Sequence, residues 1–387
     1  MTATEWINRQ RAELIQQVVA WSNINSGSRN VPGLNSAAKA IHADFQAIEP
    51  EFSELLRPDE TDSGPMAIFR KRPRAAQQLL FFGHLDTVYS PEHPLQRAAL
   101  TDVQIRGPGV CDMKGGLAIL LCGLSAFERF VQNKNFGWTI IINSDEEIGS
   151  PVSSSLFESE AKKHRFGFGF EPALEDGSLA STRKGSGTFT FIAYGRAAHS
   201  GRNPAAGRNA LVPLAQFILA CQRLNEQRST VFLNPAIVSG GEATNVIPDR
   251  AICRLNVRTT SREDEDWLRQ EMEQLRVSLQ DGDRYRTELA GHFTAPPKMM
   301  SPEISWLLTV AQRAAAQIGI DLDAKPTGGT CDGNRLAQYG LPNLDNLGAR
   351  GGAIHSENEF LIPESLVERS QLLFAMLGLL NEELRCG

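Results

Sequence analysis

Apolar and polar residues alternate along this chain in patterns that predict both helices and strands. One amphipathic first helix is predicted by apolar residues at helical spacing, namely Ile7, Leu14, Ile15, Val18, Val19 and Trp21. The next stretch, SGSRNVPGLN at residues 26–35, is rich in turn residues and is predicted to be a loop. Apolar runs at residues 79–82, 138–142 and 166–170 predict buried strands, and polar residues follow each of them at once.

Short apolar strands separated by helical segments predict an α/β core with a mostly parallel sheet. The apolar run GGLAILLCGLSAF, residues 115–127, is shorter than the roughly 20 residues that cross a bilayer, so it is predicted to be a buried helix. Further helices are predicted at residues 304–319 and 365–380. Active sites of parallel sheets gather at the carboxyl ends of the strands, which is where GHLD, NSDEE and FEP stand.

A different pattern begins after TRKGSG, residues 182–187. It predicts, in order, a strand at 188–195, a helix at 210–224, strands at 230–238 and 251–259, a helix at 261–277 and a last strand near 286–289. This β-α-β-β-α-β order resembles a ferredoxin-like fold, and FTAPPKMMSP at 293–302 is predicted to be the return linker. The expected organisation is therefore a catalytic domain at 1–184 and 297–387, interrupted by an inserted α+β domain at 185–296.

Length, charge and cysteine content narrow the class of protein. A chain of 387 residues exceeds the usual size of a single core, which agrees with two domains. The net charge of −6 gives no general reason to bind nucleic acid or an anionic membrane surface. Charges interrupt the N-terminal segment, so no secretion signal is expected, and the six cysteines include no CxxC pair. A cytoplasmic protein with free thiols is the expectation.

Acids and histidines stand after the predicted strands or in glycine-rich loops: His84, Asp112, Glu146, Glu147, Glu171 and His355. Each alone has an ordinary explanation, such as a core or loop histidine for His84 and His355, a helix N-cap for Asp112 and a surface acid for Glu171. Together they supply imidazoles and carboxylates for two divalent metal ions, with one carboxylate left as a general base for water. Asp86 stands where it can accept the other ring N–H of His84.

Seven motifs in order along essentially the whole chain resemble the M20 family of co-catalytic zinc metallopeptidases, and within it the glutamate carboxypeptidase branch. They are GHLDTV, GPGVCDMKGG, NSDEEIGS, FEP, GRAAHSG, GGTCDGN and GAIHSENE. The resemblance implies that Asp112 bridges two zinc ions, that His84 and Glu171 complete one of them, and that Glu147 and His355 complete the other. It also implies that Glu146 is the general base, that Asp86 orients His84, and that the Asp112–Met113 peptide bond is cis. Co²⁺ or Mn²⁺ could replace zinc, because the same ligand types bind them.

The resemblance gives the inserted domain the role of a lid and dimerisation domain. It implies that His199 reaches the partner subunit's site and polarises the scissile carbonyl, and that Asn245 contacts the substrate. It implies that Arg258 grips a free carboxylate, for which the guanidinium fork is well suited. From the residues alone, a surface ion pair would be the expectation for Arg258.

Other positions are weaker candidates or departures from the family pattern. Lys184 and the backbone of Gly328 and Gly329 are candidates for substrate contact, with plain solvation as the alternative for Lys184. Cys331 stands where relatives commonly have Ser, which could alter selectivity or create an oxidation site. Asp145 is not a family ligand and is expected to be solvated or to lie behind the ligands.

The predicted function is hydrolysis of an amide bond next to a free carboxylate, in a small peptide or N-acyl amino acid. The expected enzyme is a homodimer that releases a C-terminal amino acid, with Glu146 taking a proton from zinc-activated water. An N-acyl amino-acid deacylase of the same fold is an alternative, because it would share every metal ligand. A metal-binding protein that has lost catalysis is the other alternative.

Overall fold

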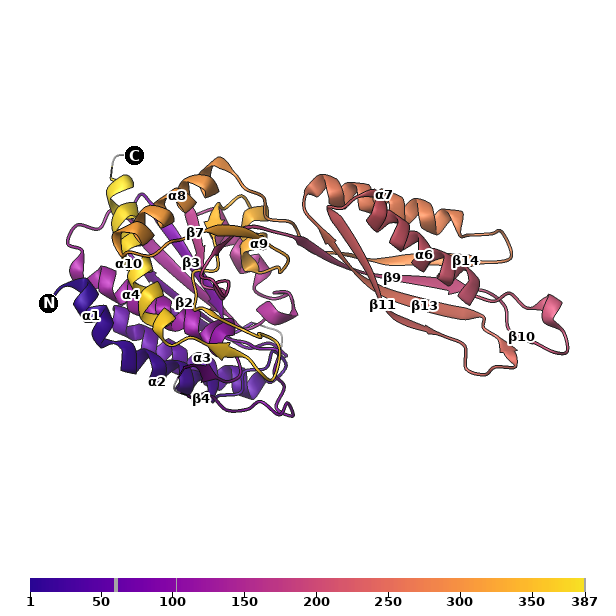
Figure 1. The fold of residues 1–387 in the computed structure, drawn as a ribbon, viewed down its shortest axis with the longest axis horizontal. Helices are drawn as coiled ribbons and strands as arrows, with labels where there is room; N and C mark the ends of the chain where they lie inside the picture. Colours follow the sequence, from indigo (N-terminus) through magenta and orange to yellow (C-terminus); the bar gives the residue numbers. More distant parts are fainter. Residues whose placement is uncertain (59–61, 102, 386–387) are drawn as a thin grey trace. The chain divides into compact units, whose positions relative to one another are not determined.

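The computed structural model describes every residue except 59–61, 102 and 386–387, and Figure 1 shows its ribbon. The chain forms two compact units. The main unit comprises Met1–Thr182, Met300–Thr327 and Cys331–Gly387, and the insert unit comprises Arg183–Met299 and Gly328–Thr330. The sequence had placed the boundaries at 184/185 and 296/297, and the short return of Gly328–Thr330 to the insert unit was not anticipated.

A six-stranded sheet with the order β1-β2-β6-β3-β7-β16 forms the centre of the main unit. The bounds are β1 Phe52–Leu56, β2 Met66–Lys71, β3 Gln78–His84, β6 Gly137–Asn143, β7 Phe166–Gly169 and β16 Asn343–Leu344. Strands β6, β3, β7 and β16 run parallel, whereas β1 and β2 add an antiparallel edge. The predicted buried strands are confirmed as β3, β6 and β7, in a mainly parallel sheet.

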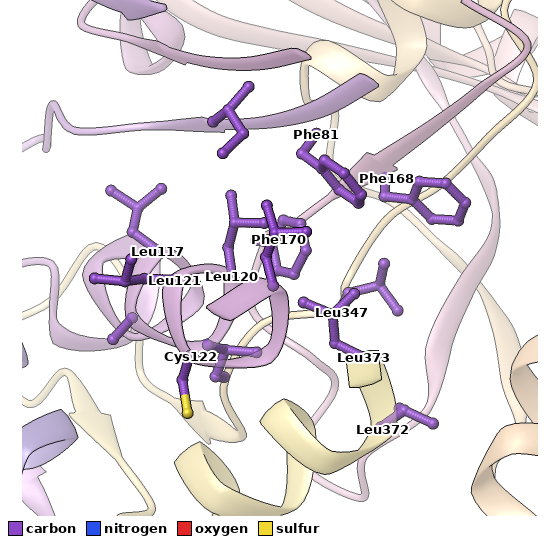
Figure 2. Close-up of a cluster of buried hydrophobic side chains, with 14 of the residues drawn as sticks. Phe81, Leu117, Leu120, Leu121, Cys122, Phe168, Phe170, Leu347, Leu372 and Leu373 are labelled. Carbon is purple, nitrogen blue, oxygen red and sulfur yellow. The ribbon is translucent and has the colours of Figure 1, made fainter. Parts of the chain in front are cut away.

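Helices cover both faces of this sheet. One face packs on α1 (Ala3–Arg9), α2 (Arg11–Ser22), α3 (Val31–Phe45), α4 (Gly116–Phe130), α8 (Pro302–Gln317) and α10 (Glu364–Glu383), and the other on α5 (Ser154–Ala161) and α9 (Asp332–Gln338). Because side chains alternate across a strand, Leu79 and Phe81 enter the first core while Leu80 and Phe82 enter the second. Figure 2 shows Phe81 among the side chains of the first core.

Two predictions about the N-terminal region were wrong. The single first helix is two helices, because the chain bends between α1 and α2 at Gln10. The loop expected at 26–35 ends early, since α3 begins at Val31. The side chain of Asn30 caps α3 by accepting from the N–H of Gly33, and proline is tolerated in a first helical turn, where its missing N–H is not needed.

The apolar run at 115–127 forms α4, and its side chains are almost all buried. The segment Val110–Phe130 is long and apolar enough to cross a membrane by length and composition, but 94% of its most apolar window is buried inside the fold. Helices α4 and α10 pack against each other, and Figure 2 shows Leu117, Leu120 and Leu121 of α4 with Leu372 and Leu373 of α10. Burial on this scale agrees with the predicted core helix.

The insert unit is a four-stranded antiparallel sheet with two helices. Its elements are β9 Gly185–Tyr194, α6 Leu211–Gln227, β11 Val231–Gly240, β13 Arg250–Thr259, α7 Arg262–Ser278 and β14 Arg286–Ala295. The sheet order is β11-β13-β9-β14, and side chains from α6 and α7 join the core of this sheet. The β-α-β-β-α-β order is as predicted, although β14 runs to Ala295 and so takes the first part of the expected linker.

Candidate metal centre

The parallel strands bring the predicted acids and histidines of the main unit together. His84 is the last residue of β3 and pairs in register with Asn143, the last residue of β6. Glu146 and Glu147 follow β6 in a 3-10 turn, Glu146–Ile148, while Glu171 follows β7. Adjacent side chains of an extended strand point in opposite directions, so this turn is what allows both glutamates to face one centre. Gly149 ends the turn with a φ of 88°, which favours glycine.

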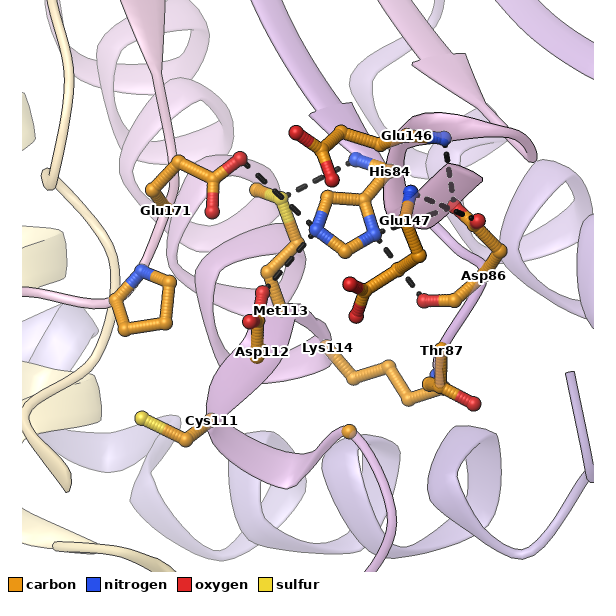
Figure 3. A network of polar contacts seen from close by, with 12 residues as sticks. His84, Asp86, Thr87, Cys111, Asp112, Met113, Lys114, Glu146, Glu147 and Glu171 are labelled. Carbon is orange, nitrogen blue, oxygen red and sulfur yellow. Dashed lines mark hydrogen bonds and ion pairs between the residues drawn. The ribbon is translucent and has the colours of Figure 1, made fainter. Parts of the chain in front are cut away.

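Asp112 lies between the two histidines. Its Oδ1 is 3.1 Å from Nε2 of His84, and its Oδ2 is 3.2 Å from Nε2 of His355. Each histidine also has one glutamate nearby: Glu171 Oε1 is 3.9 Å from His84 Nε2, and Glu147 Oε2 is 3.2 Å from His355 Nε2. The two predicted sets of metal ligands therefore lie on the two sides of Asp112. Figure 3 shows His84, Asp112 and Glu171 in this arrangement.

The Asp112 segment, Val110–Gly115, is kinked, because Asp112 and Met113 have non-helical φ and ψ, and it leads into α4. The Asp112–Met113 peptide bond is cis, as expected. His355 comes from the loop between β17 (Gly351–Gly352) and β18 (Phe360–Leu361), where it has a φ of 61°.

Asp86 contacts both the Nδ1 side of the His84 ring and the backbone of the glutamate turn. Its carbonyl oxygen is 3.1 Å and its Oδ1 3.3 Å from Nδ1 of His84. Its carboxylate also accepts the backbone N–H groups of Glu146 and Glu147, each at 3.2 Å, as dashed lines in Figure 3 show. A proton on Nδ1 leaves the Nε2 lone pair of His84 for a metal ion.

The charge distribution fits a site for cations. Burial, followed by the nearby Glu171, raises the pKa of Glu146 well above its usual range, and burial also raises the pKa of Glu147. Burial opposes the charge on Asp112, but hydrogen bonds from His355 and His84 hold its pKa well below the usual range. Ligand atoms of His84, Asp112 and Glu147 all lie within 4.8 Å of one another. Imidazole nitrogens and carboxylate oxygens at this spacing are the donor set that zinc and related divalent ions take.

Glu359 was missed at the level of the sequence. Its buried carboxylate accepts the backbone N–H groups of Gly109 at 3.0 Å, Cys111 at 2.9 Å and Asp112 at 3.0 Å. It also accepts the hydroxyl hydrogen of Tyr89 at 2.7 Å. Glu359 is the last residue of the GAIHSENE motif, but no role was assigned to it there.

Lys114 was also missed, and it is completely buried. Its ammonium donates to Ser26 Oγ at 3.0 Å and to the carbonyl of Leu85 at 3.2 Å. Burial lowers the pKa of Lys114 to about 8, against the opposing effect of Glu359 and other nearby acids. Lys114 thus places a buried cation among the acids that surround the candidate metal ligands.

The solvated position considered for Asp145 is wrong, because this residue is only 3% exposed. Its carboxylate accepts the backbone N–H groups of Val152 at 2.8 Å and Ser153 at 3.0 Å, and the hydroxyl of Ser153 at 2.6 Å. Asp145 therefore fixes the chain that leads from the glutamate turn into α5. The acids of the NSDEE motif have different structural environments although they are adjacent in sequence.

The insert unit carries His199, Asn245 and Arg258. Short strands β10 (Ala198–His199) and β12 (Val246–Ile247) pair, and the N–H of Ser200 donates to the carbonyl of Asn245 at 2.9 Å, so His199 and Asn245 are neighbours. Nδ1 of His199 accepts the N–H groups of Gly201 at 3.1 Å and Arg202 at 3.2 Å. This places the ring proton on Nε2, as a donor.

Arg258 lies at the other end of the insert sheet, opposite Ser186 of β9 and Phe232 of β11. The surface ion pair expected from the residues alone is not found among the described residues, where Nη1 of Arg258 is buried without a hydrogen-bond partner. Burial lowers the pKa of Arg258. A half-buried guanidinium whose Nη1 has no partner among the described residues suits pairing with an anion.

The remaining candidates have mixed positions. Lys184 is partly buried at the start of the insert unit, and Gly329 accepts a hydrogen bond from Arg183 Nη1 at 3.1 Å, while Gly328 has open space around it. Cys331 is 4% exposed, and its Sγ accepts from the N–H of Gly333 at 3.3 Å at the start of α9. The thiol is therefore engaged in a helix cap.

A mainly parallel α/β unit with this convergent set of histidines and acids defines the class as a metal-dependent hydrolase. Residues 80–378 match the profile described as Peptidase family M20/M25/M40, and the chain belongs to this family.

Several known proteins resemble the chain over most of its length. Carboxypeptidase G2 from Pseudomonas sp. (strain RS-16) is 25% identical over 92% of this chain and 86% of that protein. A succinyl-diaminopimelate desuccinylase from Nitrosococcus oceani is 25% identical over 96% of this chain and 99% of that protein. The crystal structure of aminopeptidase PepT from Bacillus cereus has the same fold, with a TM-score of 0.81, 20% identity, and coverage of 95% of this chain and 98% of that chain.

Proposed function

We propose that this chain hydrolyses an amide bond next to a free carboxylate and releases a C-terminal amino acid. The observation that carries the proposal is the position of Asp112, which faces one histidine with each carboxylate oxygen while Glu146 lies beside the cluster outside these ligand pairs. The ligand pairs His84 with Glu171 and His355 with Glu147 would hold two divalent ions, most simply zinc. When bound, such ions polarise the scissile carbonyl and the attacking water.

The chain's own residues then carry the proton transfers. The Glu146 carboxylate takes a proton from the attacking water and returns it to the leaving amine nitrogen. Its position beside the ligand pairs, next to His84 and Glu171, places the carboxylate where it can hold that proton between the two steps. Asp86 positions both His84 and Glu146, because its carbonyl oxygen contacts the His84 ring and its carboxylate accepts the N–H of Glu146.

Residues of the insert unit supply recognition in this proposal. The guanidinium of Arg258, whose Nη1 has no partner among the described residues, binds the carboxylate of the released amino acid, and the Nε2–H of His199 donates to the scissile carbonyl oxygen. Arg258 is eight residues from Arg250 along β13, roughly 26 Å at about 3.3 Å per residue, and His199 lies beyond the Arg250 end. One insert cannot present both groups to a single small substrate, which supports His199 acting in the partner subunit of a homodimer.

The exposed edge of the insert sheet supports such a dimer. Strand β11 is an edge strand, and its Phe232, Ile237 and Val238 are 52%, 59% and 51% exposed. An exposed apolar edge strand is a template for pairing with a second chain. We therefore place the dimer contact on β11.

The test is a release assay with zinc added, on short peptides with free and with blocked C-termini and on N-acyl amino acids. The expected result is release of the C-terminal residue from substrates whose terminal carboxylate is free, and none from peptides with a blocked C-terminus. Equal rates on blocked peptides would overturn carboxylate recognition. The similarity to a desuccinylase favours a second candidate, an N-acyl amino-acid deacylase, which would cleave the N-acyl amino acids but no peptide. Protein that binds two metal ions yet cleaves nothing in the panel would be a non-catalytic metal-binding protein.

A further inference from the structure

A pocket of about 540 Å³ lies against the candidate metal centre and has no part in the roles described above. It is lined by residues of two loops, 27–32 and 87–92, together with Glu147 and Ile148. Because Glu147 lines the pocket and also belongs to the cluster with His84 and Asp112, the pocket adjoins the candidate metal centre.

The two loops hold each other in place. The N–H of Ser28 donates to the carbonyl of Thr87 at 3.1 Å, and its hydroxyl donates to Asp86 at 2.7 Å. Gly27 packs so closely on the carbonyl of Tyr89 that a Cβ there would lie 2.4 Å from the oxygen. The walls are therefore fixed relative to the metal centre before any ligand arrives, which lowers the entropic cost of binding.

The pocket combines one cation with apolar walls. Arg29 is exposed, and no described residue forms a hydrogen bond or ion pair with it. Val88 and Ile148 line the same pocket and are 43% and 41% exposed. Glu92 also lines the pocket, but it follows the exposed Pro91 in a turn, whereas Arg29 directly follows the buried Ser28.

We propose that this pocket binds the acyl portion of the substrate and selects an acyl chain that ends in a carboxylate. Val88 and Ile148 contact the methylene groups of such a chain, and the guanidinium of Arg29 pairs with its terminal carboxylate. Glu92 weakens the preference by repelling the same carboxylate. This assignment rests on the proposed amide hydrolysis, in which the insert residues hold the released amino acid and leave the acyl group to the main unit.

The experiment compares two amides of one amino acid, chosen as the residue released best in the assay above. One carries an N-glutaryl group and the other an N-pentanoyl group, which have the same chain length and differ in the terminal carboxylate. The readout is the ratio of kcat/KM for glutaryl over pentanoyl. Wild type is expected to prefer glutaryl, and Arg29→Gln is expected to lower the ratio about tenfold. Glu92→Gln is expected to raise this ratio, and Arg29→Lys is expected to give a ratio between those of wild type and Arg29→Gln.

Arg74→Gln is the matched control, because Arg74 is an exposed arginine of the main unit outside this pocket. It is expected to leave both rates unchanged. Equal ratios in wild type, Arg29→Gln and Glu92→Gln, with both amides cleaved, would overturn the acyl-pocket assignment while the proposed hydrolysis stands. Failure of wild type to cleave any acyl amide or peptide would instead overturn the proposed function, and the pocket assignment with it.

Discussion

The carboxylate of Glu359 accepts the backbone N–H of Asp112 at 3.0 Å, although the two residues are 247 positions apart in the chain. Glu359 also follows His355 in the same loop, so one buried acid connects the segments that carry two proposed metal ligands. A mutation at this position should therefore act on the metal centre through the backbone.

The first prediction concerns this contact. Glu359→Gln replaces one accepting oxygen by an amide donor that faces backbone N–H groups, so the Asp112 segment should loosen. We expect metal affinity to fall about 10- to 100-fold, measured by titration with a competing chelator. Glu357→Gln is the control, because Glu357 is exposed in the same loop. Unchanged affinity in Glu359→Gln, in protein that melts like wild type, would contradict the positioning role.

The second prediction separates the adjacent glutamates. Glu146→Gln should lower kcat by at least about 100-fold, as expected for loss of a general base, while most of the metal stays bound. Glu147→Gln should lose metal, because Glu147 lies 3.2 Å from His355 in one proposed ligand pair. Metal analysis after dialysis, together with kcat, checks both. Equal metal loss in the two variants would reject the division of roles.

The third prediction concerns pH in protein stripped of metal by a chelator. Hydrogen bonds to Asp112 and Glu147 raise the pKa of His355 from 6.5 to about 10. Because the folded-state pKa is raised, the stabilisation is complete below about pH 6.5 and is lost as pH rises towards 10. The Tm of stripped protein should fall over this range, and less steeply in His355→Gln.

His292→Gln provides the control for that experiment, since His292 is exposed on β14 of the insert unit. Its Tm profile should follow that of the unmutated protein. Adding zinc should raise Tm, because a ligand that binds only the folded state stabilises it by about 2.7 kcal/mol at 100 times its Kd. Identical profiles of Tm against pH for stripped His355→Gln and stripped wild type would show that the His355 imidazole contributes nothing to the pH dependence of stability.

The fourth prediction concerns the proposed dimer. Ile237→Lys places a charge on the exposed edge strand β11 and should weaken dimerisation by at least about tenfold, measured by light scattering across a concentration series. Activity should fall with the dimer, because His199 is proposed to act in the partner's site. Leu100→Lys, at a residue that is 54% exposed in β4 (Ala99–Leu100) of the main unit, should change neither. A fully active monomer would exclude the shared site.

Elements with strong local patterns were predictable from the sequence. Strands are specified by the apolar runs of β3, β6 and β7 and by the alternation in β9. A strand that is buried on one or both faces shows this in the apolar pattern of consecutive residues. The helix boundary at Gln10 and the start of α3 were missed, since caps and bends depend on single backbone positions.

The sequence by itself determined which acids and histidines stand at strand ends and the order in which the motifs occur. Only the tertiary structure decided which histidine faces which oxygen of Asp112, and it alone revealed Glu359, Lys114 and the pocket at Arg29. The physical reason is that strand and helix patterns are local, with periods of two to four residues. Contacts within the site join segments as far apart as 28 residues for His84 with Asp112 and 247 for Asp112 with Glu359, and no local pattern encodes such pairings.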